Sequence, residues 1–263
     1  MNTWLGRDLG TRTVSYAERD PILYALALGV EPSRLDLVFE EQLRVLPTFG
    51  LTLAQWAPDA LGAAGGFDTS TAVHGAQALT VLAPLPRAGE VTMTARVSNV
   101  WDKGAAAVFD IEVTCDYFVA TWAIFAPGSG GFGGDRGPRT SDRPAGDPDL
   151  ALDVTTTMHQ PALYRLLGDR HAMHVDPAAA AAAGMPRPFM HGLCTIGMAV
   201  LALADSQGVH PASLTKLAGR FAAPVFPGDT LHVQGWNAND RVCFEAAADG
   251  RPVITSGYVG FGG

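Results

Sequence analysis

Four acid–base side chains lie within eight positions of this 263-residue chain. They are Asp169, His171, His174 and Asp176, and a His-Gly pair follows at 191–192. An unperturbed carboxyl and imidazole have pKa values of about 3.9 and about 6.5, so an ionised carboxylate and a neutral imidazole can together activate one water molecule. A glycine at a helix start adds a free backbone N–H beside the positive end of the helix dipole, where it can stabilise a developing oxyanion. The cluster is therefore a candidate site for proton transfer.

Asp169 and His174 need a break in the helix if they are to share one site. They are five positions apart, so on a regular helix they would point to different faces. Gly168 ends the predicted helix 161–168, and Asp176-Pro177 is a typical cap at the start of the next helix. His174 then falls in the short connection, and both side chains can project from one turn. We interpret Asp176 as a structural cap.

The segments around the cluster alternate between helical and strand patterns. Asp20 is placed as the N-cap of a short helix that Gly29 ends, and His191 is interpreted as an N-cap or a core contact. The predicted helices are 20–29, 49–61, 161–168, 177–183 and 192–207. The predicted strands, with 11–19 read as a strand or a lead-in, are 11–19, 35–39, 77–84, 90–101, 105–115, 117–126, 151–157, 215–226, 229–237, 241–248 and 252–261.

An internal echo indicates a duplicated α+β unit. APLPRAGEVTMTARV (83–97) and APVFPGDTLHVQGWN (223–237) both lead from Ala-Pro through a second proline to glycine, an acidic residue and an alternating strand. The stretch 127–150 is rich in Gly, Pro and Asp and is typical of a linker between domains. We therefore divide the chain into domains at 1–126 and 151–263, joined by the linker 127–150.

Composition excludes several classes of protein. Apolar residues make up 48% and charged residues 17%, which favours a packed globular protein. The net charge of -8 argues against nucleic-acid binding, which needs a basic face. No apolar run reaches the about 20 residues that span a bilayer, and the first residues lack the apolar core of a signal peptide. Three scattered cysteines fit a reducing compartment, so we expect a cytoplasmic location without membrane attachment.

The sequence at the cluster resembles a known family. YRLLGDRHAMHVDP (164–177) followed by GMPRPFMHGLCTIG (184–197) is similar to the signature of the (R)-specific 2-enoyl-CoA hydratases, the hydratase 2 type of the MaoC-like group. The resemblance implies an α+β double hotdog, in which each of two tandem domains is an antiparallel sheet wrapped around a helix. It also implies that only the C-terminal domain is catalytic. It extends to TFG (48–50), HGAQ (74–77), WDKG (101–104) and GSGGFGG (128–134).

The resemblance also implies roles for individual residues. Asp169 and His174 would activate the water that adds across a trans-2-enoyl-CoA, giving a (3R)-3-hydroxyacyl-CoA. The Gly192 N–H would bind the thioester oxygen. His171 stands where the family has Asn, and Ala76 where it has Glu. The residues expected to contact the acyl-CoA are His74, Gly75, Lys103, His171 and Phe221. No cofactor or metal is implied, and a homodimer is expected.

Other hypotheses stay open at this point. A metal-dependent enzyme could use Asp169, His171, His174 and Asp176 as ligands. If His171 makes the site inactive, the protein would be a non-catalytic acyl-CoA binder or partner subunit. A hotdog thioesterase is a further variant. For a hydratase, the shortness of the helix 20–29 leaves room for a long ligand and favours a medium-to-long or bulky acyl chain.

Overall fold

Ten antiparallel strands form one continuous sheet in the computed structural model, which describes residues 3–138 and 143–262. The strand order is β1-β3-β4-β5-β2-β7-β10-β9-β8-β6, so the first five strands of the chain make one half of the sheet and the last five make the other. The strands are β1 (Asp8–Tyr16), β2 (Val73–Val81), β3 (Gly89–Asp102), β4 (Ala106–Thr114), β5 (Phe118–Pro127), β6 (Leu150–Thr155), β7 (Leu214–Phe221), β8 (Thr230–Ala238), β9 (Arg241–Ala248) and β10 (Arg251–Phe261).

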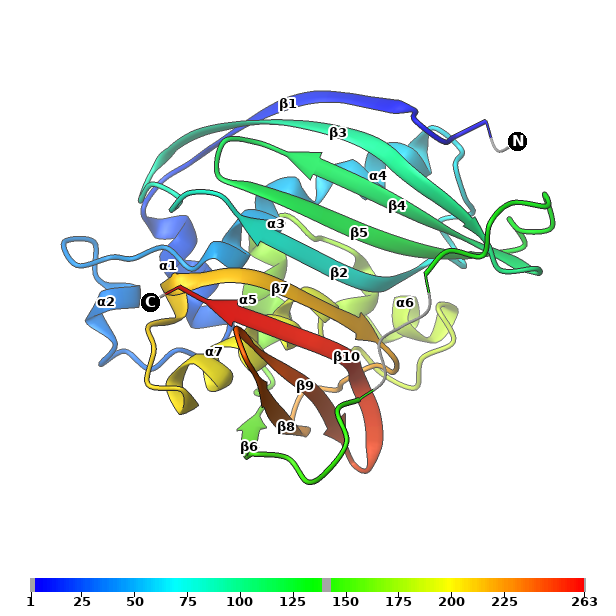
Figure 1. Cartoon of the computed structure of the whole chain (residues 1–263). Helices are drawn as coiled ribbons and strands as arrows, with labels where there is room; N and C mark the ends of the chain where they lie inside the picture. Colours follow the sequence, from blue (N-terminus) through cyan, green and yellow to red (C-terminus); the bar gives the residue numbers. More distant parts are fainter. Residues whose placement is uncertain (1–2, 139–142, 263) are drawn as a thin grey trace.

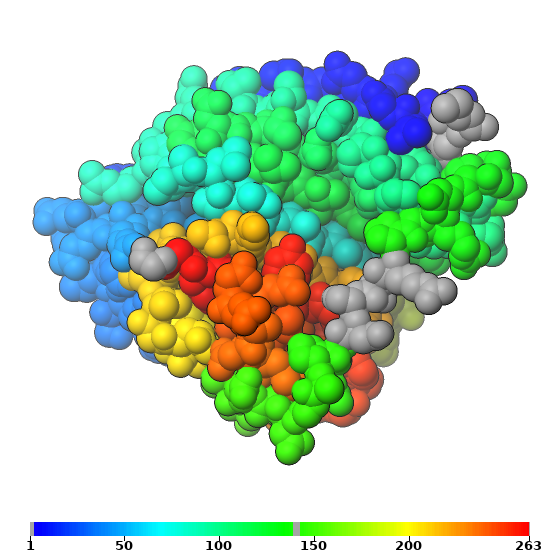
Figure 2. All heavy atoms as spheres, in the orientation of Figure 1, coloured from blue at the N-terminus to red at the C-terminus, as the bar shows by residue number. Residues whose placement is uncertain are grey.

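The helices lie on one face of this curved sheet, behind the strands in Figure 1. Most are short, and α7 is the longest of those in the described residues. The helices are α1 (Arg19–Ala27), α2 (Leu35–Val38), α3 (Gly50–Ala54), α4 (Trp56–Ala63), α5 (Gln160–Tyr164), α6 (Pro177–Ala182) and α7 (Gly192–Ser206). The opposite face of the sheet points outward and is the surface seen in Figure 2.

The two halves follow the same path. In each, the chain makes an edge strand, then helices, then the strand at the centre of the sheet. It then crosses to the strand beside the edge strand and returns toward the centre through two more strands. β2 and β7 are the two central strands, and they pair antiparallel from Ala76 with Arg220 to Thr80 with Lys216. The echoed segments 83–97 and 223–237 occupy equivalent connections, which confirms the predicted duplication. Figure 2 shows the halves in contact along this seam.

Alternating side chains of the strands build the core. In β5, Ala120, Trp122 and Ile124 are buried while the residues between them are more exposed. Because side chains alternate between the two faces of a strand, every second one lies on the helix-covered face and is removed from water. In the second half this face packs on α7, so closely that a Cβ at Gly219 of β7 would lie 2.8 Å from Ile196. The helix and the strand therefore need a glycine at their closest approach.

The first-half counterpart of α7 is the interrupted pair α3 and α4. The α3–α4 pair and α7 each follow the first helix of their half and precede its central strand. α3 begins at Gly50, and α7 begins at Gly192. A Cβ at Gly50 would lie 2.6 Å from the Phe118 ring, so this helix packs directly on β5. α1 instead packs on α5, with the Tyr24 and Tyr164 rings 6.0 Å apart. The helix 20–29 is thus not the central helix, and its length gives no reason to expect a bulky acyl chain.

Most predicted elements are confirmed, and several local predictions are wrong; the strand predicted over 215–226, for example, ends at Phe221. Within the predicted strand 35–39, residues 35–38 form helix α2, because Asp36 pairs with Arg34 and the Val38 N–H donates to the Arg34 carbonyl. Asp20 lies inside the first turn of α1, and its carboxylate accepts the Ala17 N–H at 2.8 Å instead of capping the helix. β2 begins at Val73, four residues before the predicted strand 77–84, and so includes His74.

The Gly-rich stretch that begins at Pro127 folds back onto the β3–β4 turn. Asp102, 6% exposed, accepts backbone N–H bonds from Gly104 and Gly131 on one carboxylate oxygen and from Gly133 and Gly134 on the other. These bonds lower the pKa of Asp102 to about 2. The first part of the predicted linker is therefore held in place by one side chain. Residues 139–142 lie outside the described residues, and the domain limits stay a prediction.

Replacing Asp102 with Asn tests this anchor. Asn offers one acceptor oxygen in place of two, so we expect a lower melting temperature at neutral pH. Because the pKa of Asp102 is depressed on folding, its stabilisation is present above about pH 3.9, the value for an unfolded Asp, and is lost as the pH falls toward 2. The difference between wild type and Asp102→Asn in thermal melts should narrow over that range. Equal melting temperatures at pH 7 would contradict the role.

Candidate active site

The predicted acid–base cluster forms where the chain leaves α5. A short 3-10 turn, Arg165–Leu167, follows α5, and Gly168 then takes a φ of 131°, which only glycine adopts readily. Asp169 comes directly after this reversal, and a second 3-10 turn, Ala172–His174, carries His174 back toward it. The break expected between the two side chains is therefore present.

Asp169 is held by its neighbour His171. The His171 Nδ1–H donates to Asp169 Oδ1 at 2.6 Å, and the His171 backbone N–H donates to the same oxygen at 3.3 Å. Burial alone would raise the pKa of the Asp169 carboxyl, but the hydrogen bond from His171 and the charges of His191, His171 and His174 hold it well below its usual range. The carboxylate is ionised at neutral pH and is a weak base.

A hydrogen bond fixes the tautomer of His174. Its side chain is 8% exposed, and its Nδ1–H donates to the Phe189 carbonyl at 2.8 Å. A carbonyl can only accept, so this bond fixes the tautomer with the lone pair on Nε2. Burial lowers the pKa of His174, and the nearby Asp169 carboxylate opposes that shift in part. The imidazole is therefore neutral at pH 7, with one basic nitrogen.

His191 joins this pair, a role that the sequence pattern did not reveal. It precedes α7 without capping it, and its Nε2–H donates to the Asp169 carbonyl at 3.2 Å. Its ring stacks on His174 with centroids 3.7 Å apart. Burial, with the neighbouring His174, lowers the pKa of His191 to about 3. Its position one residue before a helix-starting glycine was the available signal, but that position alone equally fits a core contact.

The N-terminus of α7 lies beside this cluster because Gly192 directly follows His191. The N–H groups of a first helical turn have no partner inside the helix. Gly192 is covered by the Phe221 ring, which a Cβ at this position would approach to 3.2 Å. Phe221 ends β7, so the central strand and the central helix of the second half meet at this point. A polarised oxygen at Gly192 would therefore sit near an apolar wall.

His74 reaches this wall from the first half. Its ring contacts Phe221 edge-on at 4.9 Å, and its Nε2–H donates to the Ala76 carbonyl at 3.0 Å. The β2–β5 register shifts between His74 and Ala76, which makes Gly75 the extra residue of a bulge. Burial lowers the pKa of His74 to about 4, and Asp169 is one of the charges that oppose this shift. Both halves thus contribute to the same region.

The other predicted residues make their contacts outside the group formed by Asp169, His174 and His191. Lys103, in the β3–β4 turn, donates from Nζ to the Arg136 carbonyl. A Cβ at Gly75 would lie 3.3 Å from the Ala123 carbonyl, so the glycine serves the bulge. Asp176 caps α6 by accepting the Ala178 N–H at 2.9 Å, as predicted. Within the described residues, Lys103 and Gly75 make no hydrogen bond or ring contact with Asp169, His174 or His191.

The predicted metal-ligand set is not the one that comes together. Asp169, His174 and His191 have candidate ligand atoms within 4.8 Å of one another, whereas Asp176 serves as a cap and His171 bonds to Asp169. The planes of the two stacked imidazoles are only 27° apart and the ring centroids 3.7 Å apart, so the ring lone pairs lie in two nearly parallel planes and converge poorly on one ion. This geometry suits proton transfer through a held water better than metal coordination.

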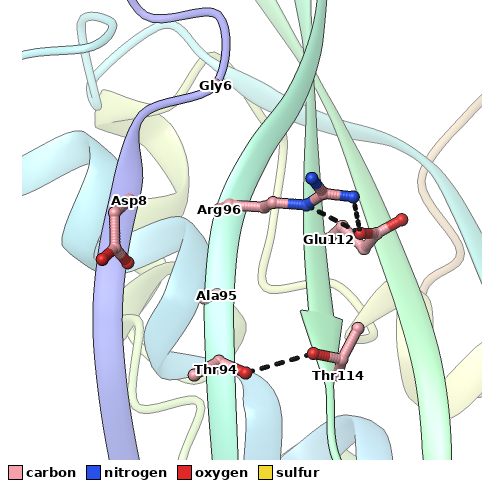
Figure 3. Close-up of a pocket in the computed structure, with 7 residues that line it drawn as sticks. All are labelled: Gly6, Asp8, Thr94, Ala95, Arg96, Glu112 and Thr114. Atoms are coloured by element: carbon pink, nitrogen blue, oxygen red, sulfur yellow. Dashed lines mark hydrogen bonds and ion pairs between the residues drawn. The ribbon is translucent and has the colours of Figure 1, made fainter.

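A hollow elsewhere on the surface lies on the outward face of the sheet, remote from this chemistry. Arg96 and Glu112 form an ion pair across it at 2.7 Å, next to a hydrogen bond between Thr94 and Thr114 (Figure 3). The residues that line it are Gly6, Asp8, Thr94, Ala95, Arg96, Glu112 and Thr114. The lining residues belong to β1, β3 and β4, together with Gly6, which lies two residues before β1.

A repeated unit of antiparallel strands curled against a helix, with one acid–base cluster at a helix N-terminus, defines the class of the protein. Family models match both halves: the MFE-2 hydratase 2 N-terminal domain over residues 14–121 and the MaoC-like domain over residues 139–255. The enoyl-CoA hydratase ChsH3 of Mycobacterium tuberculosis is 37% identical, with 98% of this chain and 96% of that protein covered. The chain belongs to the MaoC-like hydratases, in the two-domain hydratase 2 branch.

Solved structures agree with this assignment. A MaoC-like dehydratase from Phytophthora capsici superposes with a TM-score of 0.89 at 26% identity, covering 99% of this chain and 97% of that one. A Mycobacterium tuberculosis protein described as a double hotdog superposes at 0.60 with 15% identity, covering 97% and 95%. The second likeness concerns the fold alone. Together they confirm the predicted α+β double hotdog, with its two half-sheets joined into one.

The sequence predicted no membrane-spanning helix. Over residues 3–138 and 143–262, every helix is too short or too polar to cross a bilayer.

The titration of the histidines tests the geometry of the cluster without any substrate. Burial keeps His174 and His191 neutral, so their imidazoles should gain a proton only below pH 6.5, with His191 near pH 3 if the protein stays folded. The hydrogen bond to Asp169 raises the pKa of His171, which should titrate above 6.5. NMR of protein labelled with ¹⁵N-histidine measures all three. A His191 pKa at or above 6.5 would contradict the buried stack.

Proposed function

We propose that this protein adds water reversibly across the double bond of a trans-2-enoyl-CoA to give a (3R)-3-hydroxyacyl-CoA. The observation that carries the proposal is the Asp169–His174 pair, which lies beside the N-terminus of α7 with the His174 tautomer fixed. The enoyl-CoA hydratase relative, 37% identical over nearly the whole chain, supports the substrate class.

In this proposal Asp169 and His174 hold one water between them. The neutral Nε2 of His174 accepts a proton from the water as its oxygen bonds to C3 of the substrate. Asp169 stays ionised because its pKa is held well below the usual range, so it orients the water and stabilises the imidazolium. The electron pair of the double bond moves toward the thioester oxygen. C2 then takes the proton from His174, so that one water molecule has been added.

The thioester oxygen would accept the Gly192 N–H. Negative charge develops on this oxygen in the transition state, and one such donor is worth about 2.7–4 kcal/mol there. The α7 dipole has the right sign to add to the effect, because its positive end is at the N-terminus. His74, Gly75, Lys103 and Phe221 would line the acyl-CoA site, and the more exposed His171 would stand at its rim. In that arrangement Lys103 is the local cation that offsets the acidic net charge of -8 when CoA phosphates bind.

The first half would have an accommodating rather than a catalytic role. In it, Phe49 precedes the helix-starting Gly50 where His191 precedes Gly192, so the first half lacks a counterpart of the His191 imidazole. We further propose a homodimer, as the family resemblance implies, with light scattering at the mass of two chains as its test. Three free cysteines, Cys115, Cys194 and Cys243, support a cytoplasmic location.

Substitution of the acid–base pair tests the reaction. We expect Asp169→Asn and His174→Gln each to lower kcat by about 10²–10⁴-fold, the usual contribution of a general acid–base group. The assay follows loss of the conjugated thioester over a ladder from crotonyl-CoA to decenoyl-CoA and bulky ring-bearing enoyl-CoAs, with chiral analysis of the product.

Asp176→Asn is the matched control for this experiment. It changes a carboxylate in the same segment, but Asn also caps helices well, so activity should stay near wild type. Full activity of Asp169→Asn and His174→Gln would refute the assignment. Acyl-CoA binding in calorimetry without turnover would favour a binder, free thiol release a thioesterase, and loss of activity with EDTA a metal enzyme.

His191→Phe tests the third member of the cluster. Phe keeps the ring and is the residue found at the equivalent first-half position, Phe49, so the fold should tolerate it. The variant loses the Nε2–H bond to the Asp169 carbonyl. We expect kcat to fall on the order of 10²-fold, as for a misplacement of catalytic groups by about 1 Å, with the melting temperature little changed. An unchanged kcat would show that His191 is only a packing residue.

A further inference from the structure

His171 makes two hydrogen bonds to one oxygen of Asp169. Its ring Nδ1–H lies 2.6 Å from Oδ1, and its backbone N–H lies 3.3 Å from the same atom. Within the part of the chain that the structure describes, Oδ2 accepts no hydrogen bond. The two carboxylate oxygens are therefore distinct, because Oδ1 is tied to the turn and Oδ2 is left for another donor.

The exposure of the two side chains agrees with this division. The side chain of His171 is 51% exposed, whereas that of Asp169 is only 17% exposed. His171 thus lies at the rim of the site and covers the carboxylate from the solvent side. Its ring hydrogen bond spans two residues, so it forms within one turn and needs no distant element to hold it.

We propose that His171 is a positioning residue, which fixes Asp169 Oδ1 through its Nδ1–H and so presents Oδ2 to the water that His174 deprotonates. The inference rests on the proposed hydration reaction and adds a role for a residue that need not touch the substrate. Neutral and protonated imidazole can both donate from Nδ1, so this role does not depend on the charge of His171.

Substitutions at position 171 can test where the N–H donor must lie. The side-chain amide of Asn places an N–H donor at about the position of Nδ1, whereas that of Gln places it near Nε2. If loss of this donor lets a reacting group shift by about 1 Å, kcat is expected to fall about 10²-fold. Asn should therefore replace His171 in function, and Gln and Ala should not.

The test compares His171→Asn, His171→Gln and His171→Ala on the enoyl-CoA that the wild type hydrates best. We expect the Gln and Ala variants to lose kcat on the order of 10²-fold with KM within a few-fold of wild type, and the Asn variant to recover most of the activity. Melting temperatures identify any variant that fails to fold. In ¹⁵N-histidine NMR of the wild type, the His171 Nδ1–H signal should lie far downfield and should move in Asp169→Asn.

Three results would overturn the inference: wild-type kcat in His171→Ala, equal rescue by Gln and Asn, or a rise in KM alone, which would mark His171 as a substrate contact. If the wild type hydrates no enoyl-CoA, the proposed function and this inference both fall. A fully active His171→Ala would overturn this inference and leave the proposed function standing.

Discussion

The antiparallel pairing of β2 with β7 is the interaction on which the rest of the architecture depends. Five residue pairs, from Ala76 with Arg220 to Thr80 with Lys216, join two five-stranded half-sheets into one. Unpaired central edges would leave backbone N–H and C=O groups without partners, which a buried strand cannot tolerate. The same pairing brings the start of β2 next to the end of β7. His74 and Phe221 meet there, so the seam between the halves also assembles one wall of the site.

Duplication gave two similar frames, and the cluster of Asp169, His174 and His191 lies in one of them. Helix-starting glycines, Gly50 and Gly192, occur in both halves, each packed under an aromatic ring. Only in the second half does a histidine precede the glycine and a Gly168 reversal carry Asp169 and His174 toward it. The first half keeps the packing role of the helix while its central helix is split into α3 and α4. A repeated fold thus permits one half to specialise, because the sheet is stabilised by both.

Burial sets the charge states of the site. Three imidazoles surround one carboxylate, and desolvation is the largest influence on the pKa of His174 and of His191. Both are therefore neutral bases or donors at pH 7, while the hydrogen bond to Asp169 raises the pKa of the more exposed His171. The carboxylate is ionised because hydrogen bonding and neighbouring imidazoles outweigh its own burial. The site therefore places the weakly basic, fixed carboxylate of Asp169 beside the basic Nε2 of His174.

Local patterns in the sequence determined much of this protein. Alternating strands, Gly and Asp-Pro signals and the repeated Ala-Pro segments were enough to predict most elements and the duplication. The spacing of Asp169, His174 and Gly192 indicated a turn before a helix. Tertiary structure alone decided the long-range matters. It recruited His191 to the cluster by stacking on His174 and used Asp102 to anchor a Gly-rich stretch. These outcomes depend on contacts between residues distant in the chain, which propensity and spacing do not encode.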